Sequence, residues 1–367
     1  MIKYCMALLL LTGSMYAEPL HPDERDYFRT PIMLTNPDRF VKAGEAYFDS
    51  ATKRVIFQAV EQDNSDESDY SIFIGDLLFN HNNSIVELIN IKKLSNDGSA
   101  NTCAWFHPND QGTVLFATTD TPVTHGDSPG YQRGTDRYKW AFPQSMNIVS
   151  YDLATNQMVS LVNDPSNYIA EGSWSPDGRH LLYCSLATGG GDIYVTDLKT
   201  RQKSVLVDKA GYDGGPFFSP DGKRIVYRSD RRGNDLLQLF VAELKFDEHG
   251  SIIGIDREYQ LTDNPHVNWG PFWHPNGRFL IYATSEIGHH NYELFICDAD
   301  NGDKSGTTRY GTRKRRITHA EEFDGLPVFD DSGKWLMWTS KRETGTSQLW
   351  VAPFIFNLDG EPTNSGQ

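Results

Sequence analysis

A short turn recurs along this chain, and its recurrence limits the fold more than any other feature of the sequence. Its clearest copies are residues 174–178, Trp-Ser-Pro-Asp-Gly, and residues 218–222, Phe-Ser-Pro-Asp-Gly. Pro presets φ at the first central position, Asp tolerates the next, and Gly supplies a positive φ at the exit. An apolar strand precedes each copy and a β-rich strand follows, so each marks one strand–turn–strand unit.

Four further segments carry related turns, so the unit occurs six times. They begin at Asp49, His107, His274 and Asp330, in addition to Ser175 and Ser219. Units of this length with four strands stack radially around a channel. The sequence therefore predicts an all-β, six-bladed β-propeller with four-stranded antiparallel blades.

The spacing of the turns locates an insertion. The interval from His107 to Ser175 is the longest (175 − 107 = 68 residues) and contains a Pro- and Gly-rich stretch, residues 121–143. We expect this insert to lie between the second and third strands of the second blade.

The ends of the repeat region predict how the ring closes. The last unit lacks a fourth strand, whereas residues 32–35, Ile-Met-Leu-Thr, resemble the fourth strands at 259–262 and 315–318. Because an open ring would expose edge strands, we expect this N-terminal strand to complete the last blade. The predicted propeller covers residues 31–357, followed by a polar tail at 358–367.

The N-terminus has the pattern of a signal peptide. Lys3 precedes an apolar run at residues 6–11, and small residues lead to Ala17. Residues 1–17 are therefore predicted to direct export, with a short segment, residues 18–30, before the propeller. No apolar run is long enough for a transmembrane segment.

Charge and cysteine content restrict the partners. The formal net charge of −15 repels phosphate backbones, so we expect no nucleic acid partner and favour cationic ligands or basic proteins. After removal of the signal, Cys103, Cys184 and Cys297 remain. Three scattered cysteines do not form a disulfide framework, and we expect them to be small buried residues.

One repeat carries a family resemblance. Residues 212–227, Tyr-Asp-Gly-Gly-Pro-Phe-Phe-Ser-Pro-Asp-Gly-Lys-Arg-Ile-Val-Tyr, resemble the repeats of TolB-type propellers. The resemblance extends over about residues 31–357 and implies a periplasmic propeller that binds other envelope proteins. The Tol-system protein has an α/β domain before its propeller, so we expect a TolB-like propeller without that domain.

Aligning the six turns predicts a polar ring at one mouth of the channel. Positions six and four residues before each turn lead into the innermost strands, and their polar members are Glu45, Asn101, Glu171, Asp213, Asn268 and Asp324. Such oxygens can hold Ca²⁺ in the channel or bind a basic peptide segment. Alternatively, they cap turns and bind neighbouring loops.

The insert and the loops on the same face supply further candidate binding residues. These are Tyr131, Arg133, Trp140, Arg231, His289, His290 and Arg342. Aromatic and basic residues are typical of recognition surfaces, although the insert could instead fold onto its own blade. His289 and His290 are adjacent, which favours a solvated loop over a metal pair.

No catalytic motif is present, so we predict no catalytic residue. The favoured function is a monomeric, non-catalytic periplasmic scaffold for an envelope protein or peptide. One alternative is an enzyme that cleaves polysaccharide or peptide with the channel-mouth carboxylates. A second is a sensor of a cation or small ligand.

Overall fold

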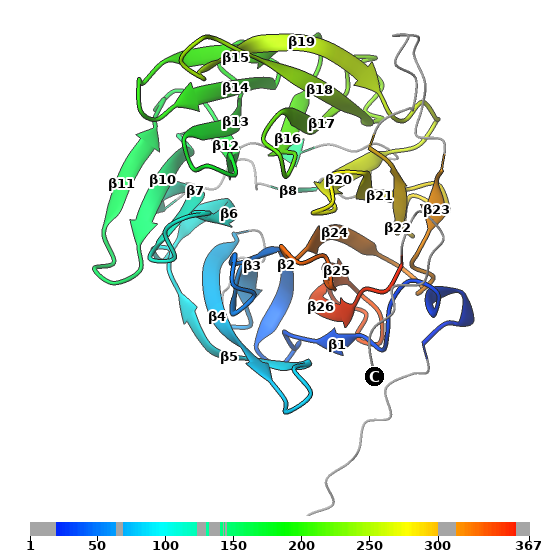
Figure 1. The fold of residues 1–367 in the computed structure, drawn as a ribbon. Helices are drawn as coiled ribbons and strands as arrows, with labels where there is room; N and C mark the ends of the chain where they lie inside the picture. The colour runs from blue at the N-terminus through cyan, green and yellow to red at the C-terminus, as the bar shows by residue number, and fades with distance from the viewer. Residues whose placement is uncertain are drawn as a thin grey trace, which may run out of the picture.

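The predicted six-bladed propeller is confirmed. The computed structural model describes residues 20–63, 69–122, 130–131, 140–141, 143, 145–299 and 313–356, which form six four-stranded antiparallel sheets around a central opening (Figure 1). The only helical segment described is the 3₁₀ turn η1 (Pro22–Glu24). Within the same residues, no helix is long and apolar enough to cross a membrane. The predicted signal peptide, residues 1–17, lies outside the described residues.

The strands follow chain order within the first three blades. Blade 1 contains β2 (Phe40–Phe48), β3 (Arg54–Glu61), β4 (Ser71–Phe79) and β5 (Ile85–Lys93); blade 2 contains β6 (Ser99–Phe106), β7 (Thr113–Pro122), β10 (Asn147–Asp152) and β11 (Met158–Val162); blade 3 contains β12 (Ile169–Trp174), β13 (His180–Ser185), β14 (Asp192–Asp197) and β15 (Lys203–Val207).

Blades 4 and 5 repeat this order, and blade 6 differs. Blade 4 contains β16 (Asp213–Phe218), β17 (Arg224–Ser229), β18 (Gln238–Phe246) and β19 (Ile252–Gln260); blade 5 contains β20 (Asn268–Trp273), β21 (Phe279–Thr284), β22 (Glu293–Asp298) and β23 (Arg315–Arg316); blade 6 contains β24 (Asp324–Phe329), β25 (Trp335–Ser340), β26 (Gln348–Pro353) and β1 (Ile32–Met33). The first strand of each blade is the innermost (Figure 1).

The expected ring closure is confirmed. β1 pairs antiparallel with β26, with Ile32 opposite Val351 and Met33 opposite Trp350. The last blade therefore takes one strand from the N-terminal region and three from the C-terminal region, which protects the edge of β26.

The insert lies where the turn spacing placed it. It connects β7 with β10, the second and third strands of blade 2, and contains a two-stranded sheet of β8 (Gly130–Tyr131) and β9 (Trp140–Ala141).

The recurring turn is held by its own side chains. The Ser175 hydroxyl donates to Asp177 Oδ1 and accepts from the His180 N–H at 2.8 Å, while the Gly178 N–H donates to the Ser175 carbonyl. Gly178 has φ of 74°, which favours glycine. Where histidine replaces serine, as in His107, ring atom Nδ1 accepts a backbone N–H at 3.2 Å.

Neighbouring blades are joined by a hydrogen bond that repeats around the ring. The residue six positions before each turn donates to a carbonyl just before the third strand of the preceding blade. The backbone pairs are Ala43 to Ser347, Ile169 to Met146, Asp213 to Gly191, Asn268 to Leu237 and Asp324 to Tyr292, at 2.7–2.9 Å. In blade 2, the Asn101 side chain makes this bond to the Tyr70 carbonyl at 2.9 Å. We call these six bonds the inter-blade stitch.

Two residues beyond the stitch, each first strand contains a β-bulge whose central residue has positive φ. The six residues are Glu45, Cys103, Glu171, Gly215, Gly270 and Leu326, with φ between 41° and 60°. Only two are glycine, although this conformation costs an ordinary residue of order 1 kcal/mol. The four others are held there by the surrounding strands.

The core is built from one large aromatic side chain in the second strand of every blade. Phe57, Phe116, Tyr183, Tyr227, Tyr282 and Trp338 have no exposed surface. Burying such a side chain stabilises the fold by about 2–3 kcal/mol, so packing between blades supports the stitch.

The Leu-Thr ending of the fourth strands has a structural explanation. The hydroxyls of Thr35, Thr262 and Thr318 accept the N–H of Leu349, Leu239 and Leu294, respectively, each on the adjacent third strand, at 2.8–2.9 Å. At the ring closure, Thr35 also donates to Gln348 Oε1 at 2.8 Å.

Thr35→Val should weaken the ring closure. The substitution keeps the shape of the side chain but leaves the buried Leu349 N–H without an acceptor, so we expect a loss of about 1–3 kcal/mol in the free energy of unfolding. Urea titration followed by fluorescence measures it, with the exposed Thr200→Val as control. Equal stability of the two variants would show that the closing strand contributes little.

Candidate functional site

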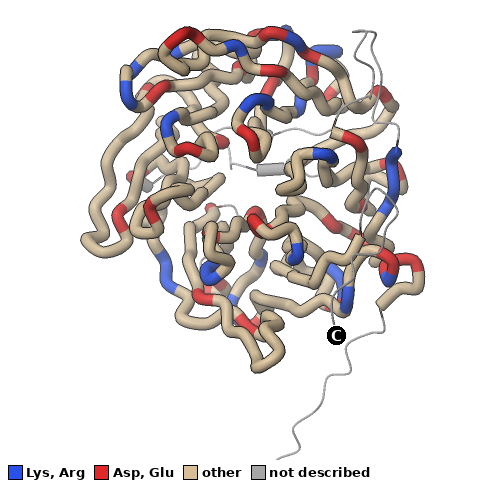
Figure 2. The backbone as a smooth tube through the Cα atoms, viewed as in Figure 1, with Lys and Arg blue, Asp and Glu red and all other residues tan. Residues whose placement is uncertain are grey.

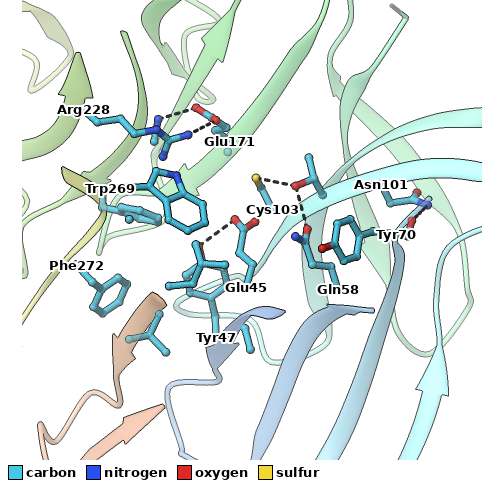
Figure 3. Close-up of a pocket in the computed structure, with 18 of the residues that line it drawn as sticks. Glu45, Tyr47, Gln58, Tyr70, Asn101, Cys103, Glu171, Arg228, Trp269 and Phe272 are labelled. Atoms are coloured by element: carbon cyan, nitrogen blue, oxygen red, sulfur yellow. Dashed lines mark hydrogen bonds and ion pairs between the residues drawn. The ribbon is translucent and has the colours of Figure 1, made fainter. Parts of the chain in front are cut away.

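A pocket that is open to solvent occupies one end of the channel (Figure 3). Its wall comes from the bulges of the first strands and from side chains of the second strands. One side is polar, with Glu45, Gln58, Glu171 and Arg228. The opposite side, from blades 5 and 6, is apolar, with Trp269, Pro271, Phe272, Leu326, Pro327 and Val328.

The structure brings together only part of the polar ring expected from sequence. Glu45, Asn101 and Glu171 line the pocket. Asp213, Asn268 and Asp324 do not line it; each is at most 1% exposed at the start of an inner strand. All six bulge residues line the pocket, whereas of the four polar residues at the stitch position only Asn101 lines it.

The three buried residues have partners within the ring. The Asn268 side chain donates to the Asn264 side chain at 2.9 Å. Asp324 accepts from Trp338 Nε1 at 2.9 Å and from Arg342 at 3.1 Å. Asp213 accepts from the Lys209 N–H at 3.0 Å and lies 3.7 Å from Arg231, and burial raises the pKa of its carboxyl.

Arg231 and Arg342, expected on a binding face, also have internal partners. Each donates through Nε to the serine two residues earlier, Ser229 or Ser340. Arg231 pairs with Glu258 at 2.6 Å and stacks on the Phe240 ring at 3.8 Å. Arg342 is buried and pairs with Glu24 and Asp324 at 3.1 Å.

The remaining predicted residues are placed only in part. His289 is half-buried beside Tyr292, and His290 is exposed, with ring centroids 5.9 Å apart. The backbones of Tyr131 and Trp140 are paired across β8 and β9, and Arg133 lies outside the described residues. Pro143, at the end of the insert, lines the pocket.

Glu171 is fully engaged by its surroundings. Its Oε1 accepts from Arg228 at 2.6 Å and from the Tyr212 hydroxyl at 2.5 Å, and Oε2 accepts from the Gly215 N–H at 2.6 Å. Glu171 and Arg228 thus form an ion pair in the pocket wall. Figure 2 shows that acidic and basic residues also lie side by side in the loops around the opening. Because Glu171 is bonded on both oxygens, its charge is balanced within the protein.

Two glycines make room for this cluster. A Cβ on Gly215 would collide with the Arg228 guanidinium, and one on Gly214 with the Tyr212 hydroxyl and Glu171. The Gly214-Gly215 pair is therefore the sequence signal for the cluster. Alone, it did not identify Arg228, which lies in the next strand.

Glu45 differs from Glu171 because it has no ion-pair partner among the residues that the structure describes. Its Oε1 accepts a long hydrogen bond, 3.3 Å, from the Tyr47 hydroxyl. Burial raises the pKa of its carboxyl, the Cys103 hydrogen bond opposes this, and the nearby Glu171 charge adds to the increase. Glu45 is thus a carboxylate in poor solvation that faces an open pocket (Figure 3).

Cys103 lies next to Glu45 in the same wall. Its thiol is 3.1 Å from the Thr102 hydroxyl, which donates to Gln58. Burial, followed by the charges of Glu45 and Glu171, raises the pKa of the thiol well above its usual range. Because only the thiolate is a strong nucleophile, this environment does not suit covalent catalysis. The three cysteines described are free thiols; Cys184 and Cys297 are buried as expected, whereas Cys103 is half-buried and lines the pocket.

Four aromatic rings form the floor of the pocket. Tyr47, Trp105, Phe217 and Phe272 follow the bulge residues by two positions, with ring centroids 4.3–6.3 Å apart. Phe217 and Phe272 also line the pocket at the other end of the channel. The cluster therefore separates the two ends and closes the base of the pocket.

The arrangement suits binding better than acid–base catalysis. A pair of carboxylates needs one oxygen free to accept a proton and another to donate it, but Glu171 is occupied on both oxygens. Among the described residues, no histidine lines the pocket. What remains is an unpaired carboxylate, aromatic faces and an apolar wall.

Comparisons with known proteins agree with the fold. A sequence profile of the TolB beta propeller domain matches residues 138–252. The Tol-Pal system protein TolB of Francisella tularensis is 31% identical over 97 residues, 26% of this chain and 22% of that protein. An uncharacterised protein of Agrobacterium fabrum is 28% identical over 136 residues, 35% of this chain and 43% of that protein. The matches thus span less than half of either relative.

Solved structures show the same architecture. The putative TolB from Agrobacterium tumefaciens superposes with a TM-score of 0.55 at 14% identity, covering 89% of this chain and 97% of that one. TolB from Acinetobacter baumannii gives 0.51 at 17% identity, covering 85% and 63%. The predicted resemblance is confirmed: residues 138–252 match the TolB beta propeller domain, and the fold resembles that of the solved TolB propellers.

Glu45→Gln should make Cys103 more reactive. Removing this charge lowers the pKa of the thiol, so we expect several-fold faster alkylation at pH 8. Mass spectrometry of the Cys103 peptide after iodoacetamide pulses measures the rate. Cys103→Ser, treated in parallel, identifies the peptide signal. An unchanged rate would mean that Glu45 does not act on the thiol.

The raised pKa of Glu293, on β22, should make the stability of the fold depend on pH. Burial, followed by the Asp324 charge, raises the pKa of its carboxyl to about 8 despite the ion pair with Arg316 at 2.7 Å. The folded state therefore retains this proton where the unfolded chain has lost it. The contribution to stability is complete below pH 4.5 and is lost as the pH rises to 8.

Glu293→Gln should remove this loss. We expect the variant to gain about 2–4 kcal/mol relative to wild type between pH 4.5 and pH 8.5. Urea unfolding at both pH values measures it, with Glu87→Gln on the exposed face of β5 as control. A parallel pH dependence of Glu293→Gln and wild type would refute the assignment.

Proposed function

We propose that this chain is a periplasmic, non-catalytic scaffold that binds a basic segment of another envelope protein at the pocket of Glu45. The observation that carries the proposal is the Glu45 carboxylate, which is poorly solvated, has no ion pair among the described residues and faces the open pocket. An unpaired carboxylate in such a place is costly, and a cationic ligand would offset that cost.

The rest of the pocket fits the side chain of lysine or arginine. Tyr47, Tyr70, Trp269 and Phe272 offer aromatic rings near the carboxylate, and a cation is attracted to the face of such rings. The apolar wall of blades 5 and 6 would contact the aliphatic stem, which in Lys and Arg packs on apolar surface. One charged head and one apolar stem therefore match the two sides of the pocket.

The pocket supports a basic side chain better than a calcium ion. Ca²⁺ takes 6–8 oxygen ligands, whereas Glu171 is already bonded to Arg228, Tyr212 and the Gly215 N–H. A bound Ca²⁺ would have to displace the Arg228 ion pair. The pocket therefore offers too few free oxygen ligands for a Ca²⁺ sensor. A basic side chain needs only the one carboxylate of Glu45.

The cellular location rests on the sequence. The predicted signal peptide at residues 1–17 directs export, and a relative named as a Tol-Pal system protein shares the repeat. A ring of blades around a pocket is a suitable shape for holding one segment of a partner. Enzymatic cleavage stays the second hypothesis; it would need a second free carboxylate beside Glu45, whereas both oxygens of Glu171 already accept hydrogen bonds.

A peptide panel tests the proposal. The decapeptides would share the same aromatic and aliphatic flanking residues. They would differ only in the central residue, which is Lys, Arg, norleucine or Glu. Calorimetry with the wild-type chain should detect Lys and Arg peptides and not the Glu peptide. Glu45→Gln should weaken the Lys peptide at least about tenfold, the cost of a desolvated ion pair.

The matched control is Glu248→Gln, the same chemical change at an 87% exposed side chain, which should bind like wild type. Preference for the norleucine or Glu peptide would overturn the proposed charge recognition. Equal binding by Glu45→Gln and Glu248→Gln would show that the peptide binds elsewhere.

A further inference from the structure

A second candidate site lies away from the channel, where the N-terminal segment meets the connection between blades 5 and 6. His21, Asp23 and His319 form a group whose nitrogen and oxygen atoms lie within 4.8 Å of one another. It is the one group of three or more potential metal ligands found among the described residues. Two of its members precede η1 or belong to it, and the third lies nearly 300 residues later.

The two backbones are held together independently of these side chains. The buried carboxylate of Glu24 accepts the His319 N–H at 2.8 Å and pairs with Arg342 at 3.1 Å. Farther along the segment, Phe28 is fully buried and bridges Phe354. In Figure 1, the blue η1 turn accordingly lies beside the ring, near β23. The candidate ligands are therefore brought together by buried contacts between two distant parts of the chain.

The candidate ligand atoms lie near one another, and the two rings must rotate before their nitrogen lone pairs converge on one ion. The His21 and His319 rings stack with centroids 5.0 Å apart and an angle of 5° between planes. Asp23 Oδ2 lies 4.0 Å from His21 Nδ1. A tetrahedral ion with bonds of about 2.0–2.2 Å needs ligand atoms roughly 3.3 Å apart. His21 and Asp23 are 47% and 68% exposed, so their side chains have room for this rotation.

We propose that His21, Asp23 and His319 bind a divalent transition-metal ion, with Zn²⁺ as the best match. Two imidazoles and one carboxylate are borderline ligands that suit Zn²⁺ and disfavour Mg²⁺ and Ca²⁺, which take oxygen ligands. Three protein ligands leave the fourth position to water. On binding, a His21 nitrogen would exchange its weak hydrogen bond from the Asp23 N–H, 3.3 Å long, for the metal.

The ion would fasten the N-terminal segment to the propeller. Glu24 already supplies an outer support, since it fixes the backbone of His319, and outer contacts of this kind orient metal ligands. Binding to the folded chain alone raises its stability by mass action. The site is thus independent of the peptide pocket and can be tested without knowing the partner.

Zinc titration of the chain without a polyhistidine tag tests the proposal. Competition with a chromophoric chelator should give one Zn²⁺ per chain, and saturating Zn²⁺ should raise the Tm. His319→Ala, His21→Ala and Asp23→Asn should each weaken binding about tenfold or more and abolish the increase in Tm. Mg²⁺ in excess should not compete.

His249→Ala, at a 77% exposed histidine, is the matched control and should bind Zn²⁺ like wild type. Circular dichroism without metal checks that each variant is folded. If His319→Ala does not fold, the variants at the exposed positions His21 and Asp23 still test the site. The proposal fails if wild type takes up no stoichiometric Zn²⁺, or if folded His21→Ala and Asp23→Asn bind as tightly as His249→Ala.

Discussion

The inter-blade stitch is the interaction on which the rest of the structure depends. At the start of every inner strand, one N–H reaches the carbonyl that precedes the third strand of the neighbouring blade. This bond fixes the offset between blades. The bulge two residues later turns the side chain of its own central residue toward the channel. Because the large aromatic side chain of each second strand is fully buried in a close-packed core, the mouth of the channel is a rigid ring.

The rigidity of this ring explains how the fold tolerates Glu45, whose carboxylate is poorly solvated and whose backbone is strained. Glu45 has φ of 41°, and both its backbone strain and its desolvation are sustained by the surrounding strands. Glu171, at the equivalent position two blades away, has the same backbone conformation but is neutralised by Arg228. These two glutamates make the pocket electrostatically asymmetric: the Glu171 charge is balanced by Arg228, whereas Glu45 has no ion pair among the described residues.

The sequence predicted the architecture because the signals of the fold are local. The Ser-Pro-Asp-Gly turn, the Leu-Thr ending and the strand at residues 32–35 each act over a few residues and recur, so counting them predicted blades, ring closure and insert. The site depends on which side chains face the channel, and that is decided by a bulge with no marker in the sequence except glycine at Gly215 and Gly270. A repeat alignment therefore groups Asp213, Asn268 and Asp324 with Glu45, although these three lie two positions before the bulge and do not line the pocket. Arg228 and the group around His319 depend on contacts between distant segments, which a repeat alignment does not reveal.

A crystal structure of the chain with its captured envelope partner tests the central claim most directly. The account predicts a lysine or arginine nitrogen of the partner within about 4 Å of the Glu45 carboxylate, its stem against Trp269 and Leu326, and the Arg228 ion pair intact. A partner bound on the outer strands, or one that places an acidic or apolar group beside Glu45, would contradict it.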